Sequence, residues 1–173
     1  MSELADEVES GGRPRPAVAV VALGTNLGDR EAALESALTE LAALPLTDLV
    51  RTSAVVETVA VTTSGEDASA PRYLNAVALV ATRLAPSVLL ERLHEVEAHH
   101  GRERRERWGD RTLDLDLISY GDVVSDDPRL TLPHPRAGER TFVLAPWAEV
   151  DAAAELPGVG AVADLLERLR SAS

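Results

Sequence analysis

The sequence contains no cysteine and no lysine, and each absence excludes a kind of chemistry. Without cysteine the chain can form neither a disulfide nor a thiolate nucleophile, so a reducing compartment suits it. Without lysine it has no Walker-type phosphate loop, whose mechanism requires that side chain, and no Schiff-base chemistry. All 17 basic residues are therefore arginines.

Long apolar runs are also missing, and aromatic residues are few. No apolar stretch approaches the ~20 residues of a membrane helix, and residues 1–16 lack the basic start and apolar centre of a signal peptide. We therefore expect a cytoplasmic protein with a disordered acidic leader over residues 1–16. With 3% aromatic residues and a formal net charge of −12, we expect it to bind neither nucleic acid nor an anionic membrane.

The remaining residues, 17–173, are enough for a single domain with a substantial core. Apolar, β-rich runs predict strands over 17–23, 47–58, 73–83 and 112–121. Apolar residues at helical spacing predict helices over 30–44 and 86–100, with Asp29 as the first helix's N-cap and Gly101 as the second helix's C-cap. The order β-α-β-β-α-β predicts an α+β, ferredoxin-like core, with an antiparallel sheet and helices packed on one face.

Other segments carry weaker signals. Residues 59–72 are rich in Gly, Ser and Thr, and their second half is expected to be a mobile loop. Residues 122–136 predict a turn with short extended pieces, and two short helices are expected over 139–150 and 162–173.

Two aspartates interrupt the strand predicted in "RTLDLDL". Asp114 and Asp116 are two residues apart, so they point to one face, ~6.6–7 Å from each other, while leucines point to the other face. Mg²⁺ takes one or two protein carboxylates and fills its other positions with phosphate oxygens and water. The pair could therefore hold two hard cations for phosphoryl chemistry. The alternative is a half-exposed edge strand with no ligand.

An arginine-rich segment comes just before the two aspartates. Guanidinium groups suit bidentate phosphate binding, and five of them fall within ten residues: Arg102, Arg104, Arg105, Arg107 and Arg111. The alternative is a solvated loop in which Glu103 and Glu106 neutralise part of that charge. Neither glutamate explains the tryptophan in the same segment. Taken together, the segment and the aspartate strand predict a site for a nucleotide polyphosphate with magnesium.

At these residues the sequence closely resembles the 6-hydroxymethyl-7,8-dihydropterin pyrophosphokinase family. The segments "LGTNLGDR", "YLNAV", "RWGDRTLDLDL" and "LPHPR…ERTFVLAPWAEV" are similar to that family's sequence blocks, in the same order, over about residues 17 to 150. The resemblance implies transfer of the terminal pyrophosphoryl group of ATP to the hydroxymethyl oxygen of 6-hydroxymethyl-7,8-dihydropterin, with release of AMP, in folate biosynthesis. It implies ATP as co-substrate and two Mg²⁺ ions, and we expect a monomer.

The resemblance also implies roles for individual residues. Asp114 and Asp116 would hold the metal ions and would be catalytic, together with Arg102 and Arg111. The residues that would contact ATP are Glu97, Arg107, Trp108, Thr131, His134 and Arg140. The residues that would contact the pterin are Tyr73, Asn75, Phe142 and Thr58, with the two rings sandwiching the heterocycle. Judged without the resemblance, Phe142 reads as ordinary core and Tyr73 as a surface side chain.

Three other functions fit the same topology. A non-catalytic ligand-sensing module would keep a small-molecule pocket, but it has no need of paired aspartates beside arginines. An RNA-binding domain requires exposed aromatics and a basic face, which this composition does not offer. A metal-dependent phosphatase would use the aspartates differently, and analysis of the reaction products distinguishes it.

Overall fold

The computed structural model describes residues 15–62, 65–101 and 112–172. The leader predicted over residues 1–16 lies outside this range apart from its last two residues. The whole arginine-rich segment, residues 102–111, also lies outside it. Among the described helices, none combines the length and the apolar character needed to cross a membrane.

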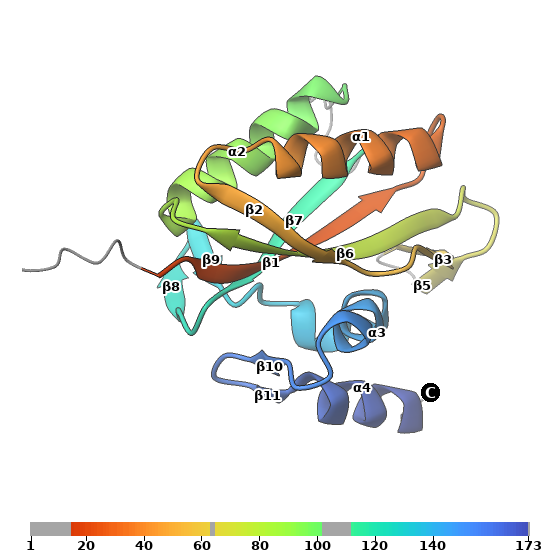
Figure 1. The fold of residues 1–173 in the computed structure, drawn as a ribbon. Helices are drawn as coiled ribbons and strands as arrows, with labels where there is room; N and C mark the ends of the chain where they lie inside the picture. The colour runs from red at the N-terminus through yellow and green to blue at the C-terminus, as the bar shows by residue number, and fades with distance from the viewer. Residues whose placement is uncertain (1–14, 63–64, 102–111, 173) are drawn as a thin grey trace, which may run out of the picture.

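An antiparallel sheet of five strands forms the middle of the molecule (Figure 1). Its strands are β1 (Ala17–Thr25), β2 (Thr47–Thr52), β3 (Val56–Thr58), β6 (Tyr73–Thr82) and β7 (Asp114–Tyr120). The strand order is β2-β6-β1-β7, with β3 also paired to β6. The most N-terminal strand therefore lies inside the sheet, and the strand with the two aspartates forms an edge.

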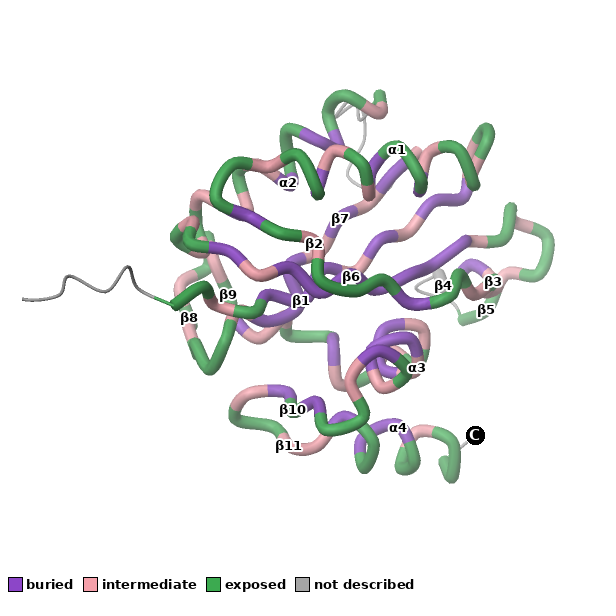
Figure 2. Tube along the Cα trace, in the orientation of Figure 1, coloured by how far each residue is buried: buried purple, intermediate pink, exposed green. Residues whose placement is uncertain are grey.

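Helices cover both faces of this sheet. The first pair, α1 (Arg30–Ala42) and α2 (Pro86–His99), lies on one face as predicted (Figure 1). On the other face lies α3 (Thr141–Val150), with α4 (Val162–Ser171) packed against it. The prediction of helices on one face therefore holds for the core pair, whereas the sequence had assigned α3 and α4 to no face. Successive residues of a strand point to opposite faces of the sheet, and in the central strands both sets are apolar. Both faces of the sheet therefore need a covering layer. On the α3 side, Val20, Val77 and Leu79 join the core that α3 and α4 bury. In Figure 2 much of the sheet and of α3 has the colour of buried residues.

The ends of the two core helices follow the predicted signals. The Asp29 carboxylate accepts a hydrogen bond from the Ala32 N–H at 3.1 Å and so caps α1. Pro86 occupies the first turn of α2, where its missing N–H costs nothing. Gly101 follows α2 with a φ of +83°, a left-handed conformation that glycine adopts without a Cβ clash.

The strand predicted over residues 47–58 is two strands. Between β2 and β3, the Ser53 N–H donates to the Val77 carbonyl, and Ser53 Oγ accepts from the Val77 N–H, both at 2.9 Å. A serine side chain thus takes the place of a backbone partner and interrupts the regular ladder. Both strands still pair with β6.

Three small antiparallel pairs complete the fold. The strand β5 (Gly65–Asp67) pairs with β4 (Ala60–Thr62), whereas residues 68–72, most of the segment predicted as a mobile loop, belong to no strand. The extended pieces predicted over 122–136 are β8 (Ser125–Asp127) and β9 (Leu130–Leu132). A short 3₁₀ turn, η1 (Ala137–Glu139), leads into α3, and β10 (Glu155–Leu156) pairs with β11 (Gly160–Ala161) before α4.

Candidate active site

A row of cross-strand partners positions the aspartates. Asn75 on β6 pairs with Gly24 on β1, and Gly24 pairs with Asp114 on β7. Two residues further along each strand, Ala22 pairs with Asp116. Directly opposed residues project to the same face of a sheet, so the amide and both carboxylates share the α3 face. The leucines between and beside the aspartates are buried in the core under α1 and α2, as the strand alternation predicts.

A cavity of about 260 Å³ lies over this row, close to the lower end of the ~300–1,000 Å³ of small-molecule sites. It is lined by Ala22, Leu23, Gly24, Thr58, Val59, Tyr73, Asn75, Asp114, Asp116, His134, Arg140 and Phe142. All four residues predicted to contact the pterin therefore lie in one cavity with both aspartates. We refer to it as the ring cavity.

Asn75 is fixed at the floor of the ring cavity. It is 6% exposed, and its Nδ2 donates to Thr58 Oγ1 at 2.7 Å. A Cβ added to Gly24 would lie 3.3 Å from Asn75 Oδ1, so the missing side chain makes room for the amide. Sequence reasoning placed Gly24 at the end of its strand and missed it as a site residue. The strand continues to Thr25, so Gly24 lies inside it. A glycine inside a strand often marks a place where another group comes close to the backbone, and that is the signal that could have identified it.

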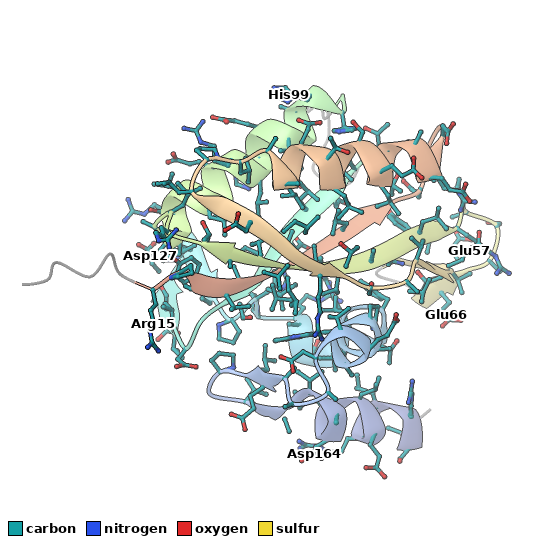
Figure 3. All side chains as sticks on the ribbon, viewed as in Figure 1. Arg15, Glu57, Glu66, His99, Asp127 and Asp164 are labelled. Atoms are coloured by element: carbon teal, nitrogen blue, oxygen red, sulfur yellow. The ribbon has the colours of Figure 1, made fainter. Side chains whose placement is uncertain are left out.

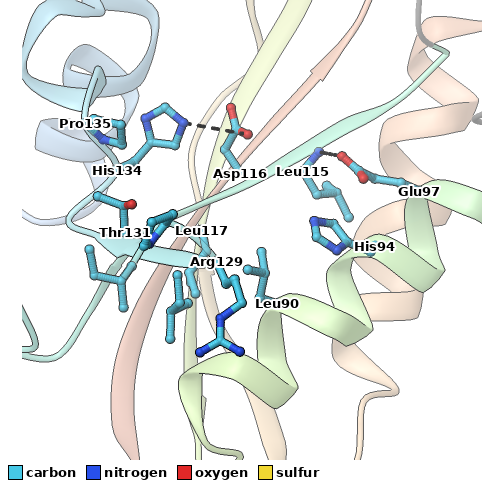
Figure 4. Close-up of a pocket in the computed structure, with 13 residues that line it drawn as sticks. Leu90, His94, Glu97, Leu115, Asp116, Leu117, Arg129, Thr131, His134 and Pro135 are labelled. Atoms are coloured by element: carbon cyan, nitrogen blue, oxygen red, sulfur yellow. Dashed lines mark hydrogen bonds and ion pairs between the residues drawn. The ribbon is translucent and has the colours of Figure 1, made fainter. Parts of the chain in front are cut away.

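A second cavity, of about 240 Å³, lies on the other side of Asp116 (Figure 4). It is lined by Leu90, His94, Glu97, Leu115, Asp116, Leu117, Pro128, Arg129, Leu130, Thr131, Leu132, His134 and Pro135. Three residues predicted to contact ATP lie here: Glu97, Thr131 and His134. His94 and Arg129 were not predicted, since neither belongs to a recognisable motif. We refer to this space as the nucleotide cavity.

Asp116 and His134 line both cavities and form the border between them. Asp116 Oδ2 accepts a hydrogen bond from Arg140 Nη1 at 3.2 Å, and its Oδ1 lies 4.0 Å from His134 Nε2. The Asp116 side chain remains 41% exposed. The Arg140 guanidinium also lies over the Phe142 ring, 5.6 Å from its centroid, so one cation contacts both the acid and the aromatic wall.

A backbone hydrogen bond from β7 holds His134 in place. The β1–β7 ladder skips Ile118, because Val21 pairs with Leu117 and Val20 with Ser119. The Ile118 carbonyl instead accepts from the His134 backbone N–H at 2.8 Å. Bulges of this kind are frequent beside active sites, where they redirect the chain.

The protonation of His134 follows from its surroundings. Burial lowers the pKa of His134 below its usual value, although the nearby carboxylate of Asp116 acts in the opposite direction. Burial therefore favours the neutral imidazole. Its Nδ1 accepts from the Arg136 N–H at 3.2 Å, so Nε2 carries the proton and directs it toward Asp116.

The donor set suits magnesium bound together with phosphate. Within residues 15–62, 65–101 and 112–172, no three His, Cys, Asp or Glu side chains gather as a metal-binding group. Asp114 and Asp116 supply carboxylate oxygens on one face and line an open cavity. Since Mg²⁺ takes one or two carboxylates and completes its shell with phosphate oxygens and water, the residues present fit a nucleotide-bound Mg²⁺.

Hydrogen bonds connect the described residues that flank the arginine-rich segment on its two sides. Thr112 Oγ1 donates to the His100 carbonyl, and Thr25 Oγ1 donates to the Thr112 carbonyl. Four predicted site residues lie between these flanking residues and outside the described ones: Arg102, Arg107, Trp108 and Arg111. Their assignment to catalysis and to ATP stays a prediction.

Comparison with known proteins identifies a family match over most of the chain. The model of 7,8-dihydro-6-hydroxymethylpterin-pyrophosphokinase matches residues 20–152. The chain is 37% identical over 150 residues to the 2-amino-4-hydroxy-6-hydroxymethyldihydropteridine pyrophosphokinase of Haemophilus influenzae, covering 87% of this chain and 91% of that protein. The corresponding Pseudomonas aeruginosa protein is 40% identical over 137 residues, with 79% and 82% covered.

Solved structures share the fold. The crystal structure of HPPK-DHPS in complex with substrates matches 91% of this chain with a TM-score of 0.71 at 10% identity. Wild-type Plasmodium falciparum HPPK-DHPS with pteroate matches 92% with a TM-score of 0.71 at 13% identity. This chain spans 44% and 45% of those chains. The likeness confirms the predicted α+β, ferredoxin-like fold.

Proposed function

The chain belongs to the 7,8-dihydro-6-hydroxymethylpterin-pyrophosphokinase family, and we propose that it transfers the pyrophosphoryl group of ATP to the hydroxymethyl oxygen of 6-hydroxymethyl-7,8-dihydropterin, releasing AMP, in folate biosynthesis. The observation that carries this proposal is the position of Asp116. It lines the ring cavity and the nucleotide cavity at once, so substrates in the two spaces meet at one carboxylate.

The ring cavity binds the pterin. Tyr73 and Phe142 line it and supply aromatic faces for the flat heterocycle, while Asn75 and Thr58 supply amide and hydroxyl groups for its polar edge. The Asn75–Thr58 hydrogen bond fixes the orientation of the amide before the substrate arrives. Because this side chain is already ordered, less conformational entropy is lost when the substrate binds.

The nucleotide cavity binds ATP, with Glu97 and Thr131 in its walls and His134 at its border. His134 and Arg140 then contact the phosphates, since Nε2–H and guanidinium groups both donate to phosphate oxygens. Both side chains already lie beside Asp116. Arg102, Arg107, Trp108 and Arg111 extend this set from the segment that follows α2.

Asp114 and Asp116 would hold two Mg²⁺ ions. Bound there, the ions would supply charge neutralisation for phosphoryl transfer. The protein's own part is geometric: the β1–β7 pairing fixes both carboxylates on one face. Arg140 exchanges its hydrogen bond with Asp116 for a phosphate oxygen when the nucleotide enters. Positioning of the reacting groups accounts for much of the rate enhancement in such reactions.

We also propose that residues 17–173 act as one catalytic domain, and that the enzyme works as a monomer in the cytoplasm. One continuous family match, over residues 20–152, supports the single domain. The absence of cysteine suits a reducing compartment that supplies ATP.

The test is an assay of AMP release with ATP and Mg²⁺, run with and without the hydroxymethylpterin. We expect AMP and pterin pyrophosphate in equal amounts, and only when both substrates are present. Asp164→Asn on the outer face of α4 (Figure 3) is the matched control for Asp116→Asn, and only the second should abolish turnover. Release of ADP, or of phosphate independent of the pterin, would overturn the proposal.

A further inference from the structure

The edge strand β7 needs partners on its outer side. It pairs only with β1 in the described sheet, and in an antiparallel pair alternate residues turn their N–H and C=O groups away from the partner strand. Buried backbone groups of this kind have to be hydrogen-bonded by something else. What satisfies the outer edge of β7 therefore also decides how firmly the strand is held.

A buried carboxylate satisfies one of these groups. Glu97, on the last turn of α2, is 2% exposed, and its Oε1 accepts a hydrogen bond from the Leu115 N–H at 2.8 Å (Figure 4). Leu115 lies between Asp114 and Asp116 in the sequence. The hydrogen bond therefore reaches the strand at the peptide that separates the two proposed metal ligands.

A second contact supports the same edge on the far side of Asp116. The Ile118 carbonyl accepts from the His134 backbone N–H at 2.8 Å. The outer edge of β7 is thus held at residue 115 by a side chain from α2 and at residue 118 by the backbone that follows β9. Asp116 lies between the two contacts.

The register of β7 determines what its side chains do. A slip of one residue would turn the aspartates into the core and the leucines toward the cavities. A buried carboxylate is costly unless it is hydrogen-bonded, so Glu97 at this place needs a specific partner, and the Leu115 N–H is one. Hydrogen bonds to a charged acceptor are also stronger than neutral ones.

We propose that Glu97 is a positioning residue for metal binding: through the Leu115 N–H it holds β7 so that Asp114 and Asp116 present their carboxylates at the separation that the metal ions require. This inference rests on the proposed function, since it takes the two aspartates as the metal ligands. It replaces the direct ATP contact that the family resemblance implied for Glu97: although Glu97 lines the nucleotide cavity, its influence on the nucleotide acts through the metal.

The experiment compares Glu97→Ala with Glu97→Gln, whose amide oxygen can still accept from Leu115. Calorimetry with a non-hydrolysable ATP analogue gives its affinity at a series of Mg²⁺ concentrations, including none. We expect the Mg²⁺ concentration for half-maximal binding to rise about tenfold in Glu97→Ala, the factor that ~1.4 kcal/mol produces. In Glu97→Gln it should stay within about twofold of the wild type.

A second readout reports the hydrogen bond itself. Residue-resolved amide exchange should show the Leu115 N–H protected in the wild type and in Glu97→Gln, and exchanging faster in Glu97→Ala. Thr47→Val is the matched control, because it removes another buried side-chain hydrogen bond, to Thr82 at 2.7 Å, at the opposite end of β6 from Asn75. This variant should leave the Mg²⁺ dependence unchanged.

The outcomes separate the two proposals. If the wild type binds the analogue equally well with and without Mg²⁺, the proposed metal role of the aspartates fails. If the wild type needs Mg²⁺ and Glu97→Ala needs no more of it, only the positioning role fails. If Glu97→Gln loses affinity for the analogue even without Mg²⁺, Glu97 contacts the nucleotide directly, and the positioning role is again overturned.

Discussion

At the residue scale, a missing side chain shapes the site as much as the side chains that are present. Gly24 lies between Asn75 and Asp114 in the row across the sheet, and the amide of Asn75 occupies the space that a Cβ would restrict. Beside the Asn75 amide, the floor of the ring cavity is therefore made by the small residues of β1, Ala22 and Gly24. Under the proposed function, that amide contacts the polar edge of the heterocycle.

Gly24→Ala should weaken pterin binding more than ATP binding. The new Cβ would lie 3.3 Å from Asn75 Oδ1 and would push the amide by a few tenths of an ångström. We expect the KM for the pterin to rise about tenfold, a loss of ~1.4 kcal/mol, while the KM for ATP changes less than about twofold. Steady-state kinetics with each substrate varied in turn measures both constants.

Gly138→Ala is the control for this substitution, because its Cβ would meet Leu156 at an ordinary 3.6 Å. Equal increases in both KM values for Gly24→Ala would contradict the division of the site into two cavities. So would a similar effect of Gly138→Ala.

Single residues with local signals could be predicted from the sequence. Asp29 and Gly101 were identified because capping depends on neighbours within one turn. The two aspartates were placed on one face because strand alternation has a period of two. The hydrogen bond between Glu97 and Leu115, in contrast, depends on how α2 docks against β7, and no local pattern encodes that contact.

At the element scale, a carboxylate joins the C-terminal ends of the two core helices. Glu40 on α1 contacts His99 Nδ1 through Oε2 and His100 Nε2 through Oε1, both at 2.8 Å. His99 lies at the outer end of α2 (Figure 3). The contact ties the helices together just before the arginine-rich segment begins.

Glu40→Gln should lower stability at neutral pH but not in acid. Partial burial opposes ionisation of Glu40, but hydrogen bonds from His99 and His100 outweigh it, so its pKa is lowered from the usual 4.5. A lowered folded-state pKa gives stability that is present above 4.5 and lost as pH falls through the folded-state value. We expect a loss below about 1 kcal/mol at pH 7, since the pair is partly exposed.

Urea unfolding at pH 7 and near pH 3 measures this difference. Glu35→Gln, on the exposed face of the same helix, is the control and should be neutral at both values. A Glu40→Gln deficit that persists undiminished in acid would show that the charge of Glu40 is not responsible.

Element boundaries show where sequence reasoning stops. The two core helices and four principal strands were predicted because their periodicities extend over many residues. The break between β2 and β3 was missed, since it depends on a hydrogen bond between Ser53 and Val77, 24 residues away. The pairing of β5 with β4 was missed for a related reason. A Gly- and Ser-rich composition predicts a loop, but such a segment can still form a strand when another strand pairs with it.

At the scale of the whole molecule, the layer formed by α3 contributes both to the stability of the fold and to the candidate site. The helix α3 buries the second face of the sheet, with Trp147 only 3% exposed, and its N-terminal turn carries Phe142 into the ring cavity beside Arg140. The layer that α3 begins thus both completes the core and supplies one wall of the site. Sequence patterns did predict α3 and α4 as helices, but they did not show which face of the sheet these helices cover.

Trp147→Ala should destabilise the protein by ~3–5 kcal/mol, as for other large aromatic side chains removed from a core. Urea unfolding monitored by far-UV circular dichroism measures the change. Val159→Ala, at a side chain that is 53% exposed, should stay within about 0.5 kcal/mol of the wild type. A loss below about 1 kcal/mol for Trp147→Ala would mean that the α3 layer contributes little to the fold.

The hydrogen bonds along the outer side of β7 have a further consequence, for how the protein behaves at high concentration. An uncovered edge strand is a template onto which a strand of another molecule can add, and it is a common start of aggregation. Because Glu97 and the backbone of His134 already occupy the Leu115 N–H and the Ile118 carbonyl, an incoming strand finds those positions taken. The contacts that we propose position the two aspartates therefore also protect the folded protein from self-association along that edge.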